Sequence, residues 1–288
     1  MLEAHIAADA EISIATLPVN AKDAPEFGIL KTDHENNIHA FIEKPHASLL
    51  PEWESEVSEH MQEKGKKYLA SMGIYIFNKS LLVELMGDQE TKDFGKEIIP
   101  QAVGKHKILS YQYEGYWTDI GNIESFFEAN IGLTADIPEF NLFDNENKIF
   151  TRPRLLPPSK FRNSIINQSL ISEGCIINAK EIKSSVIGIR SRIGEGTVLE
   201  NCYVMGNDFY QDLDELNYES GINKIHVGIG ENCFIKNALV DKNVRIGNNV
   251  HINGGKHLDN FTNELYSIKD GIVVIKKGVT LSDNFRIE

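Results

Sequence analysis

The feature that most constrains the fold is a set of aliphatic residues spaced six apart in the second half of the chain. A period of six fits neither a helix nor ordinary strand alternation. It fits a parallel β-helix with three short faces per coil, in which each hexapeptide places one aliphatic side chain inward. The residues with this spacing form five tracts: Ile165, Ile171 and Ile177; Ile193, Leu199 and Met205; Ile229 and Ile235; Val240, Ile246 and Ile252; and Ile275, Leu281 and Ile287. We therefore expect residues 161–288 to form a β-helix, with an antiparallel sandwich as the alternative.

One acidic stretch, residues 207–224, lacks the repeat and predicts a loop that projects from the β-helix. Cys175 and Cys233 follow Ile171 and Ile229 by four residues, where a small inward side chain fits. With Cys202 the cysteine count is odd and contains no CxxC pair, which argues against a disulfide framework or a zinc site. We expect three buried thiols in a reducing compartment.

The first part of the chain, residues 1–135, alternates strands with helices, which predicts an α/β layer. The segments expected as strands are 11–19, 27–30, 38–44, 68–77 and 107–115, and those expected as helices are 80–86, 93–103 and 121–133. Residues 136–160 contain several prolines and no clear periodicity, so we expect a linker there.

The charge balance is acidic, with 42 Asp and Glu against 29 Lys and Arg, a net charge of -13. An acidic chain repels nucleic acid and anionic membranes at long range, so neither is expected as a partner. The sequence contains no long apolar stretch, which predicts no membrane span, and its start does not have the pattern of a signal peptide. We expect a cytoplasmic protein.

Five motifs precede the β-helix in a fixed order: FGIL (27–30), FIEKP (41–45), SMGIYIF (71–77), DFGKEIIP (93–100) and GYWTDIG (115–121). In this order the whole chain resembles glucose-1-phosphate adenylyltransferase, also called ADP-glucose pyrophosphorylase. The resemblance implies α/β plus β architecture: the C-terminal part of a nucleotidyltransferase-type α/β domain followed by a left-handed parallel β-helix. It also implies formation of ADP-glucose and pyrophosphate from ATP and α-D-glucose 1-phosphate in glycogen or starch synthesis.

The family's Gly-rich loop of the type G-x-G-T-R-L, which holds the ATP phosphates, does not occur in this sequence. The resemblance therefore suggests an N-terminally truncated enzyme that is inactive alone, with an exposed sheet edge where strands are lacking. It also implies Mg²⁺ as cofactor, bound by Asp119. Because the family's first metal carboxylate, the partner of the one that Asp119 matches, has no counterpart here, we expect Asp119 to bind Mg²⁺ weakly.

The resemblance assigns glucose 1-phosphate contacts to Gly28, Glu43, Lys44, Ser71, Tyr75, Asp93, Phe94 and Trp117. A Lys between a strand and Pro45 can place a compact charge on the sugar phosphate, and Glu43 can accept hydrogen bonds from sugar hydroxyls. On a regular strand Ser71 and Tyr75 share a face, with Gly73 leaving space for a sugar ring. The alternatives are structural: an exposed ion pair at the strand end, a bulge at Gly28, a core hydroxyl at Ser71, an N-cap at Asp93 and core packing of Trp117.

Regulation by a phosphorylated metabolite is implied through Lys242, Arg245 and Lys276, which are alternatively solvated turn residues. The resemblance further implies a homotetramer. Two other functions are open: a non-catalytic regulatory subunit of the same enzyme, or a hexapeptide-repeat acyltransferase that uses His226, His251 or His257 as a base.

Overall fold

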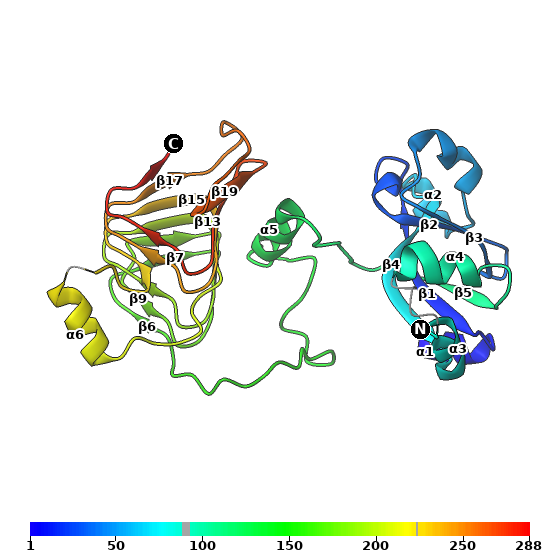
Figure 1. Cartoon of the computed structure of the whole chain (residues 1–288), viewed down its shortest axis with the longest axis horizontal. Helices are drawn as coiled ribbons and strands as arrows, with labels where there is room; N and C mark the ends of the chain where they lie inside the picture. The colour runs from blue at the N-terminus through cyan, green and yellow to red at the C-terminus, as the bar shows by residue number, and fades with distance from the viewer. Residues whose placement is uncertain (88–92, 223) are drawn as a thin grey trace. The chain divides into compact units, whose positions relative to one another are not determined.

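The computed structural model describes residues 1–87, 93–222 and 224–288. The chain divides into two compact units, Met1–Trp117 and Thr118–Glu288 (Figure 1). The first is an α/β layer and the second is a β-helix with its attached segments, which confirms the predicted fold class.

A five-stranded sheet in the order β3-β2-β4-β1-β5 forms the centre of the first unit. Strand β1 pairs parallel with β5, and the other pairs are antiparallel. The strands are β1 (Ile12–Val19), β2 (Gly28–Thr32), β3 (Ile38–Glu43), β4 (Tyr68–Phe77) and β5 (Ile108–Gln112). Each lies where a strand is expected from the sequence.

Both faces of this sheet are covered, because neighbouring strand residues point to opposite sides. Ile29 packs in one apolar cluster and Leu30 in the other, and Ala70 and Leu69 divide in the same way. The helical segments of the unit are α1 (Leu2–Ala7), η1 (Ala24–Glu26), η2 (Ala47–Trp53), α2 (Glu59–Glu63), α3 (Lys79–Leu85), η3 (Phe94–Ile98) and α4 (Ile99–Ala102).

The helix expected at 93–103 is interrupted, since η3 is a π-turn and only α4 is α-helical. Pro100 has no N–H for the carbonyl of Lys96, so a continuous α-helix would lack a hydrogen bond there. The outer edge of β5 is also less bare than expected. Asn37 forms a bridge with Leu109, and the Ser110 N–H donates to the Asn36 carbonyl at 2.8 Å.

The β-helix of the second unit stacks parallel strands so that aliphatic residues of successive coils lie in register. Ile177 aligns with Ile193, which aligns with Ile229; Leu199 aligns with Ile235 on another face. These side chains are at most 5% exposed and share one continuous core. The strands are β6 (Lys160–Phe161), β7 (Ile165–Asn167), β8 (Leu170–Ile171), β9 (Ile176–Ile177), β10 (Glu181–Lys183), β11 (Val186–Ile187), β12 (Arg192–Ile193), β13 (Val198–Val204), β14 (Gly228–Ile229), β15 (Phe234–Val240), β16 (Arg245–Ile246), β17 (His251–Asn253), β18 (Phe261–Thr262), β19 (Tyr266–Lys269), β20 (Ile272–Ile275), β21 (Thr280–Leu281) and β22 (Arg286–Ile287).

Two residues of the predicted repeat do not lie in the core. Ile165 is 62% exposed on β7 because it aligns with Glu181, whereas its neighbour Ile166 aligns with the core residue Ile182. At the end of β13 it is Val204 that is buried in the core, while Met205 contacts the cluster around Phe127. The turns between hexads place asparagines such as Asn201 and Asn237 in the left-handed region, which Asn tolerates better than most residues.

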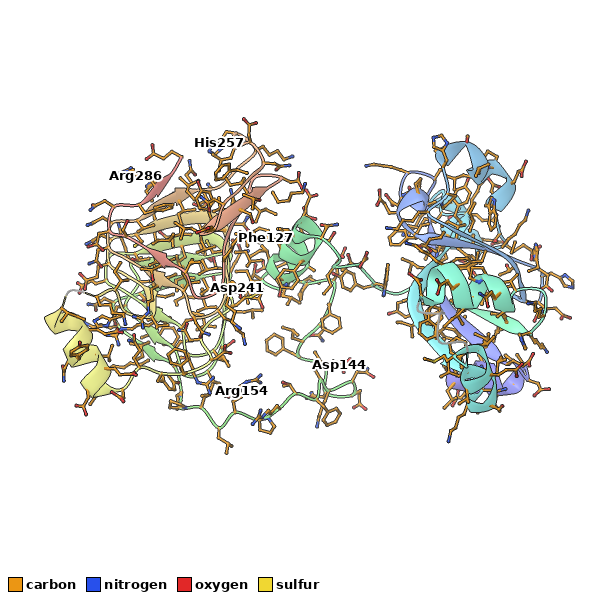
Figure 2. All side chains as sticks on the ribbon, in the orientation of Figure 1. Phe127, Asp144, Arg154, Asp241, His257 and Arg286 are labelled. Carbon is orange, nitrogen blue, oxygen red and sulfur yellow. The ribbon has the colours of Figure 1, made fainter. Side chains whose placement is uncertain are left out.

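Helix α5 (Ile123–Gly132) lies on the β-helix, although the sequence pattern grouped it with the α/β layer. Its Phe127 is 4% exposed and packs with Leu239 and Ile272 of β15 and β20. Figure 2 shows Phe127 on the side of α5 that faces the β-helix. The apolar face of α5 is therefore covered by the second unit, and the units divide after Trp117.

The stretch expected to be a loop at 207–224 contains helix α6 (Leu213–Gly221). Asn223 within this stretch lies outside the described residues. We call residues 207–222 the insert; α6 projects from the side of the β-helix in Figure 1 (yellow).

Cys175, Cys202 and Cys233 are buried in the core, and burial raises the pKa of Cys202 to about 12.

Candidate functional site

The ends of β2 and β3 bring Gly28 and Glu43 together as a cross-strand pair. A Cβ atom on residue 28 would lie 2.7 Å from Oε2 of Glu43 and 2.6 Å from Cζ of Phe41. Glycine is required here because these two side chains occupy the space above its Cα atom. The Glu43 carboxylate can therefore lie close to the sheet, because residue 28 opposite it has no side chain.

Asp93 and Gly95 bring a second carboxylate to the same place. A Cβ on residue 95 would lie 3.3 Å from Oε2 of Glu43 and 3.5 Å from Oδ1 of Asp93, so both acids flank Gly95. Asp93 also caps η3: its carboxylate accepts from the Lys96 N–H at 2.9 Å, and its own N–H donates to Glu97 at 3.1 Å. The capping alternative for Asp93 is confirmed, while its contact with a sugar stays a prediction.

An aromatic group adjoins these acids through Phe94, the residue after Asp93. The Phe94 ring stacks on Tyr75 with centroids 5.6 Å apart and planes inclined by 16°. Phe77 is tilted against both rings, at 5.7 Å from Phe94 and 6.1 Å from Tyr75. The start of η3 is therefore attached to β4 by aromatic contacts, which offer an apolar surface beside the carboxylates.

Ser71 and Tyr75 lie on either side of a bulge in β4, which the sequence pattern treated as a regular strand. Thr16 pairs with Ser71 and Ile14 with Tyr75, so three residues of β4 oppose one residue of β1. Gly73 in the bulge has φ +70°, and no atom lies within 4 Å of the position of its Cβ. The bulge brings the Ser71 hydroxyl 3.5 Å from the Tyr75 hydroxyl and leaves open space around Gly73.

Lys44 follows β3 in a left-handed conformation with φ +46°. Its N–H donates to the Phe27 carbonyl at 3.0 Å, and the buried Pro45 follows it. The side chain is exposed, and within the described parts of the chain it forms no ion pair. A non-glycine residue in this conformation costs about 1–3 kcal/mol, which the surrounding structure must offset. The alternative of an ion pair between Glu43 and Lys44 is thus not observed.

Trp117 is half-buried and packs edge-on against Phe27, the neighbour of Gly28, with ring centroids 5.9 Å apart. Asp119 belongs to the second unit, and its Oδ1 accepts from the Gly121 N–H at 3.0 Å. No group of three or more His, Cys, Asp or Glu side chains suited to a metal ion occurs in the described ranges. Asp119 by itself is too few ligands for Mg²⁺, which takes near-octahedral oxygen coordination.

The predicted effector residues all have partners within the second unit. The Lys242 ammonium lies 2.7 Å from Oδ1 of Asp208, which lowers the Asp208 pKa. Arg245 donates to Glu219 at 2.9 Å and to the Ile225 carbonyl. Lys276 donates to the carbonyl of Asn263. Lys242 and Arg245 therefore both contact the acidic insert, and they are not merely solvated turn residues.

Sequence reasoning missed Glu219, which is only 6% exposed although it lies in the acidic insert. Its carboxylate accepts from Gln211, Lys224 and Arg245 and lies 3.2 Å from His226. A signal was available, since Glu219 is followed closely by Lys224 and His226 in the sequence. Two of the three histidines proposed for acyl transfer have structural partners: His226 contacts Glu219, and His251 stacks on Phe234 at 5.0 Å.

Two comparisons with known families agree with this geometry. Residues 1–136 match the nucleotidyl transferase family, and residues 154–285 match the GLGC left-handed parallel β-helix domain. The chain is therefore a nucleotidyl transferase domain followed by a left-handed β-helix. This pair of domains is typical of glucose-1-phosphate adenylyltransferase, the family that the five motifs resemble. In the described ranges no helix is long and apolar enough to cross a membrane.

Proposed function

We propose that the chain acts in adenylyl transfer between ATP and α-D-glucose 1-phosphate, and that its first unit binds the sugar phosphate. The observation that carries this proposal is one connected cluster. Gly28 adjoins Glu43, the Glu43 and Asp93 carboxylates flank Gly95, and Phe94 stacks on Tyr75, which adjoins Ser71. Six of the eight residues assigned by resemblance thus lie together.

The cluster suits a sugar phosphate chemically. The exposed Lys44 supplies a positive charge for the phosphate, and the carboxylates of Glu43 and Asp93 can accept hydrogen bonds from ring hydroxyls. In the reaction, an oxygen of the sugar phosphate bonds to the α-phosphorus of ATP, and the bond from that phosphorus to the β-phosphate oxygen breaks, releasing pyrophosphate. The attacking oxygen is already anionic, so positioning and charge neutralisation suffice.

The 288 residues contain no G-x-G-T-R-L loop for the ATP phosphates. We infer that this chain alone binds glucose 1-phosphate without converting ATP. Mg²⁺, when bound, would neutralise phosphate charge, and by the family resemblance Asp119 would be one of its ligands. The runner-up is a regulatory subunit that keeps the sugar site and acts with a catalytic partner.

We further propose that a phosphorylated effector binds at Lys242, Arg245 and Lys276. Such an effector would have to replace Asp208 on Lys242, so its binding would be linked to the position of the insert. A homotetramer in the cytoplasm remains part of the proposal and is supported by the family resemblance.

Isothermal titration calorimetry of the chain with glucose 1-phosphate tests the proposal. We expect glucose 1-phosphate to bind saturably. Galactose 1-phosphate, which differs in the configuration of one hydroxyl, should bind with a lower affinity. A parallel assay of pyrophosphate release from ATP should be negative. Absence of sugar-phosphate binding would reject the site, whereas release of pyrophosphate would reject only the need for an ATP loop. Activity gained on adding a family member that contains the G-x-G-T-R-L loop would favour the regulatory subunit.

A further inference from the structure

A cavity of about 280 Å³ lies between the insert and the side of the β-helix. Arg190 and Arg192 line it from the β-helix, and Phe209, Tyr210, Leu213 and Leu216 line it from the insert. None of the residues assigned to the sugar phosphate or to the effector lines this cavity. Figure 1 shows α6 on the side of the β-helix where β9 lies, and Ile176 of β9 is also part of the lining.

The cavity carries a net positive charge. Among the described residues that line it, two are arginines and none is an aspartate or glutamate. Neither arginine forms an ion pair with a carboxylate in the described part of the molecule. This is unusual in a chain with a net charge of -13, where carboxylates outnumber cations. Guanidinium groups without acidic partners favour an anion, and their planar donors match phosphate oxygens.

Arg190 is held in position before any ligand binds. It has φ +58°, and its carbonyl accepts from the Asn207 side chain at 2.9 Å. Its guanidinium lies over the ring of Tyr210, 5.6 Å from the centroid. The Tyr210 hydroxyl in turn donates to the Gly174 carbonyl at 2.9 Å. A ligand would therefore meet a side chain that has already lost part of its conformational freedom, which lowers the cost of binding.

The insert supplies an apolar wall opposite the charges. Phe209 is 50% exposed and Leu213 is 77% exposed, although both line the cavity. The insert is fixed at two points, through Asp208 to Lys242 and through Glu219 to Arg245, so this wall has a defined position. Ligand pockets commonly combine apolar walls with a few polar groups and start at about 300 Å³. The volume here suits a small ligand.

We propose that this cavity binds a small phosphomonoester whose organic group is aromatic or apolar. Its phosphate would contact Arg190 and Arg192, and its organic group would pack on Phe209 and Tyr210. The proposal is independent of the sugar-phosphate site in the first unit, because none of its residues belongs to that unit.

Calorimetric titration of the whole chain with phenyl phosphate tests the proposal, with inorganic phosphate as the probe without an organic group. Arg192→Gln should weaken phenyl phosphate binding at least tenfold, because it removes a charge-assisted contact. Phe209→Ala should weaken phenyl phosphate but leave inorganic phosphate unchanged. Arg286→Gln is the matched control, since it removes the same charge from a residue that pairs with Glu288, and it should change neither affinity.

A further variant changes the wall of the cavity that the insert forms and leaves the β-helix residues unchanged. Leu213→Glu places a negative charge on the exposed wall and should also reduce phenyl phosphate binding at least tenfold. The proposal would be overturned if the unaltered chain did not bind phenyl phosphate. It would also be overturned if Arg192→Gln and Leu213→Glu bound phenyl phosphate as tightly as the unaltered chain does. Loss of binding in Lys276→Gln with none in Arg192→Gln would move the ligand to the proposed effector residues and would also overturn it.

Discussion

The guanidinium of Arg245 lies 2.9 Å from the carboxylate of Glu219, an acidic residue of the insert that is 6% exposed. Lys224 and His226 lie 2.8 Å and 3.2 Å from the same carboxylate. The hydrogen bond from Arg245 is the main reason that the pKa of Glu219 falls well below its usual range. A charged Glu219 thus joins α6 to the β-helix.

Replacing Glu219 should release the insert without unfolding the β-helix. Glu219→Gln removes the negative charge that Arg245 and Lys224 contact, and losing even one charge-assisted hydrogen bond costs about 1.5–3 kcal/mol, so local opening should become at least roughly 10-fold more frequent. Limited proteolysis of residues 208–222, followed by mass spectrometry, measures this opening. Asp214→Asn is the control, because Asp214 is exposed on the same helix, and it should be cleaved at the native rate. If Glu219→Gln were cleaved at the same rate as the native protein, the ion pair would not hold the insert in place.

The same residue predicts a dependence on pH. Because the pKa of Glu219 is lower in the folded protein than in the unfolded chain, its stabilising effect is present above the unfolded value of about 4.3 and is lost as the pH falls toward the folded value. Hydrogen-exchange protection of residues 208–222 should therefore differ between native and Glu219→Gln protein at pH 6. The difference should shrink progressively below about pH 4. A difference that stays constant down to pH 3 would contradict this assignment.

Lys44 should contribute to sugar-phosphate affinity. Lys44→Ala removes one charge-assisted contact, and we expect the Kd for glucose 1-phosphate to rise roughly 10- to 100-fold in calorimetry. Lys22→Ala removes an equal charge from an exposed residue outside the cluster and should leave the Kd unchanged. If both variants bind as the native chain does, Lys44 does not contact the phosphate.

Gly28 should be intolerant of a methyl group. Gly28→Ala brings Cβ against Phe41 and Glu43, and overpacking of this kind costs about 1–3 kcal/mol. Both tryptophans of the chain, Trp53 and Trp117, lie in the first unit, so the urea dependence of tryptophan fluorescence reports its unfolding. In Phe41→Leu, which lacks the Cζ atom, the same Gly28→Ala change should cost less. Additive effects would show that Phe41 and residue 28 do not conflict.

The three cysteines should be inert in the folded protein. All three are buried, and burial raises the pKa of each thiol, so little thiolate forms near neutral pH. Ellman's reagent at pH 8 should label fewer than one thiol per native chain within minutes and about three in guanidinium chloride. Rapid labelling of the native chain would show that its core opens readily.

The sequence predicted the fold well because most of its signals are local. Hexad spacing indicated inward residues such as Ile193 and Leu199, and apolar runs located all five strands of the sheet. The failures come from context that spacing does not contain. Ile165 matches the hexad pattern, but in the structure it aligns with Glu181, and its neighbour Ile166 aligns with the core residue Ile182. Helix α5 has an ordinary apolar face, and the pattern cannot say which unit covers it.

The sequence predicted which residues belong to the candidate site better than it predicted how they are arranged. The motifs named Gly28, Glu43 and Asp93, which the structure brings together. The bulge at Gly73 was missed because it depends on the pairing of β4 with β1, which leaves three residues opposite one. Glu219 was missed because its burial depends on Arg245, which is distant in the sequence.

The insert interrupts the hexads at a corner of the β-helix, yet Leu199 before it pairs directly with Ile235 after it. The core therefore depends on the residues that stack between coils. The length of the segment that connects two coils does not alter it. A corner can thus gain, lose or exchange a whole segment during evolution while the stack above and below stays unchanged. New binding surfaces can arise on this half of the molecule without any compensating change in its interior.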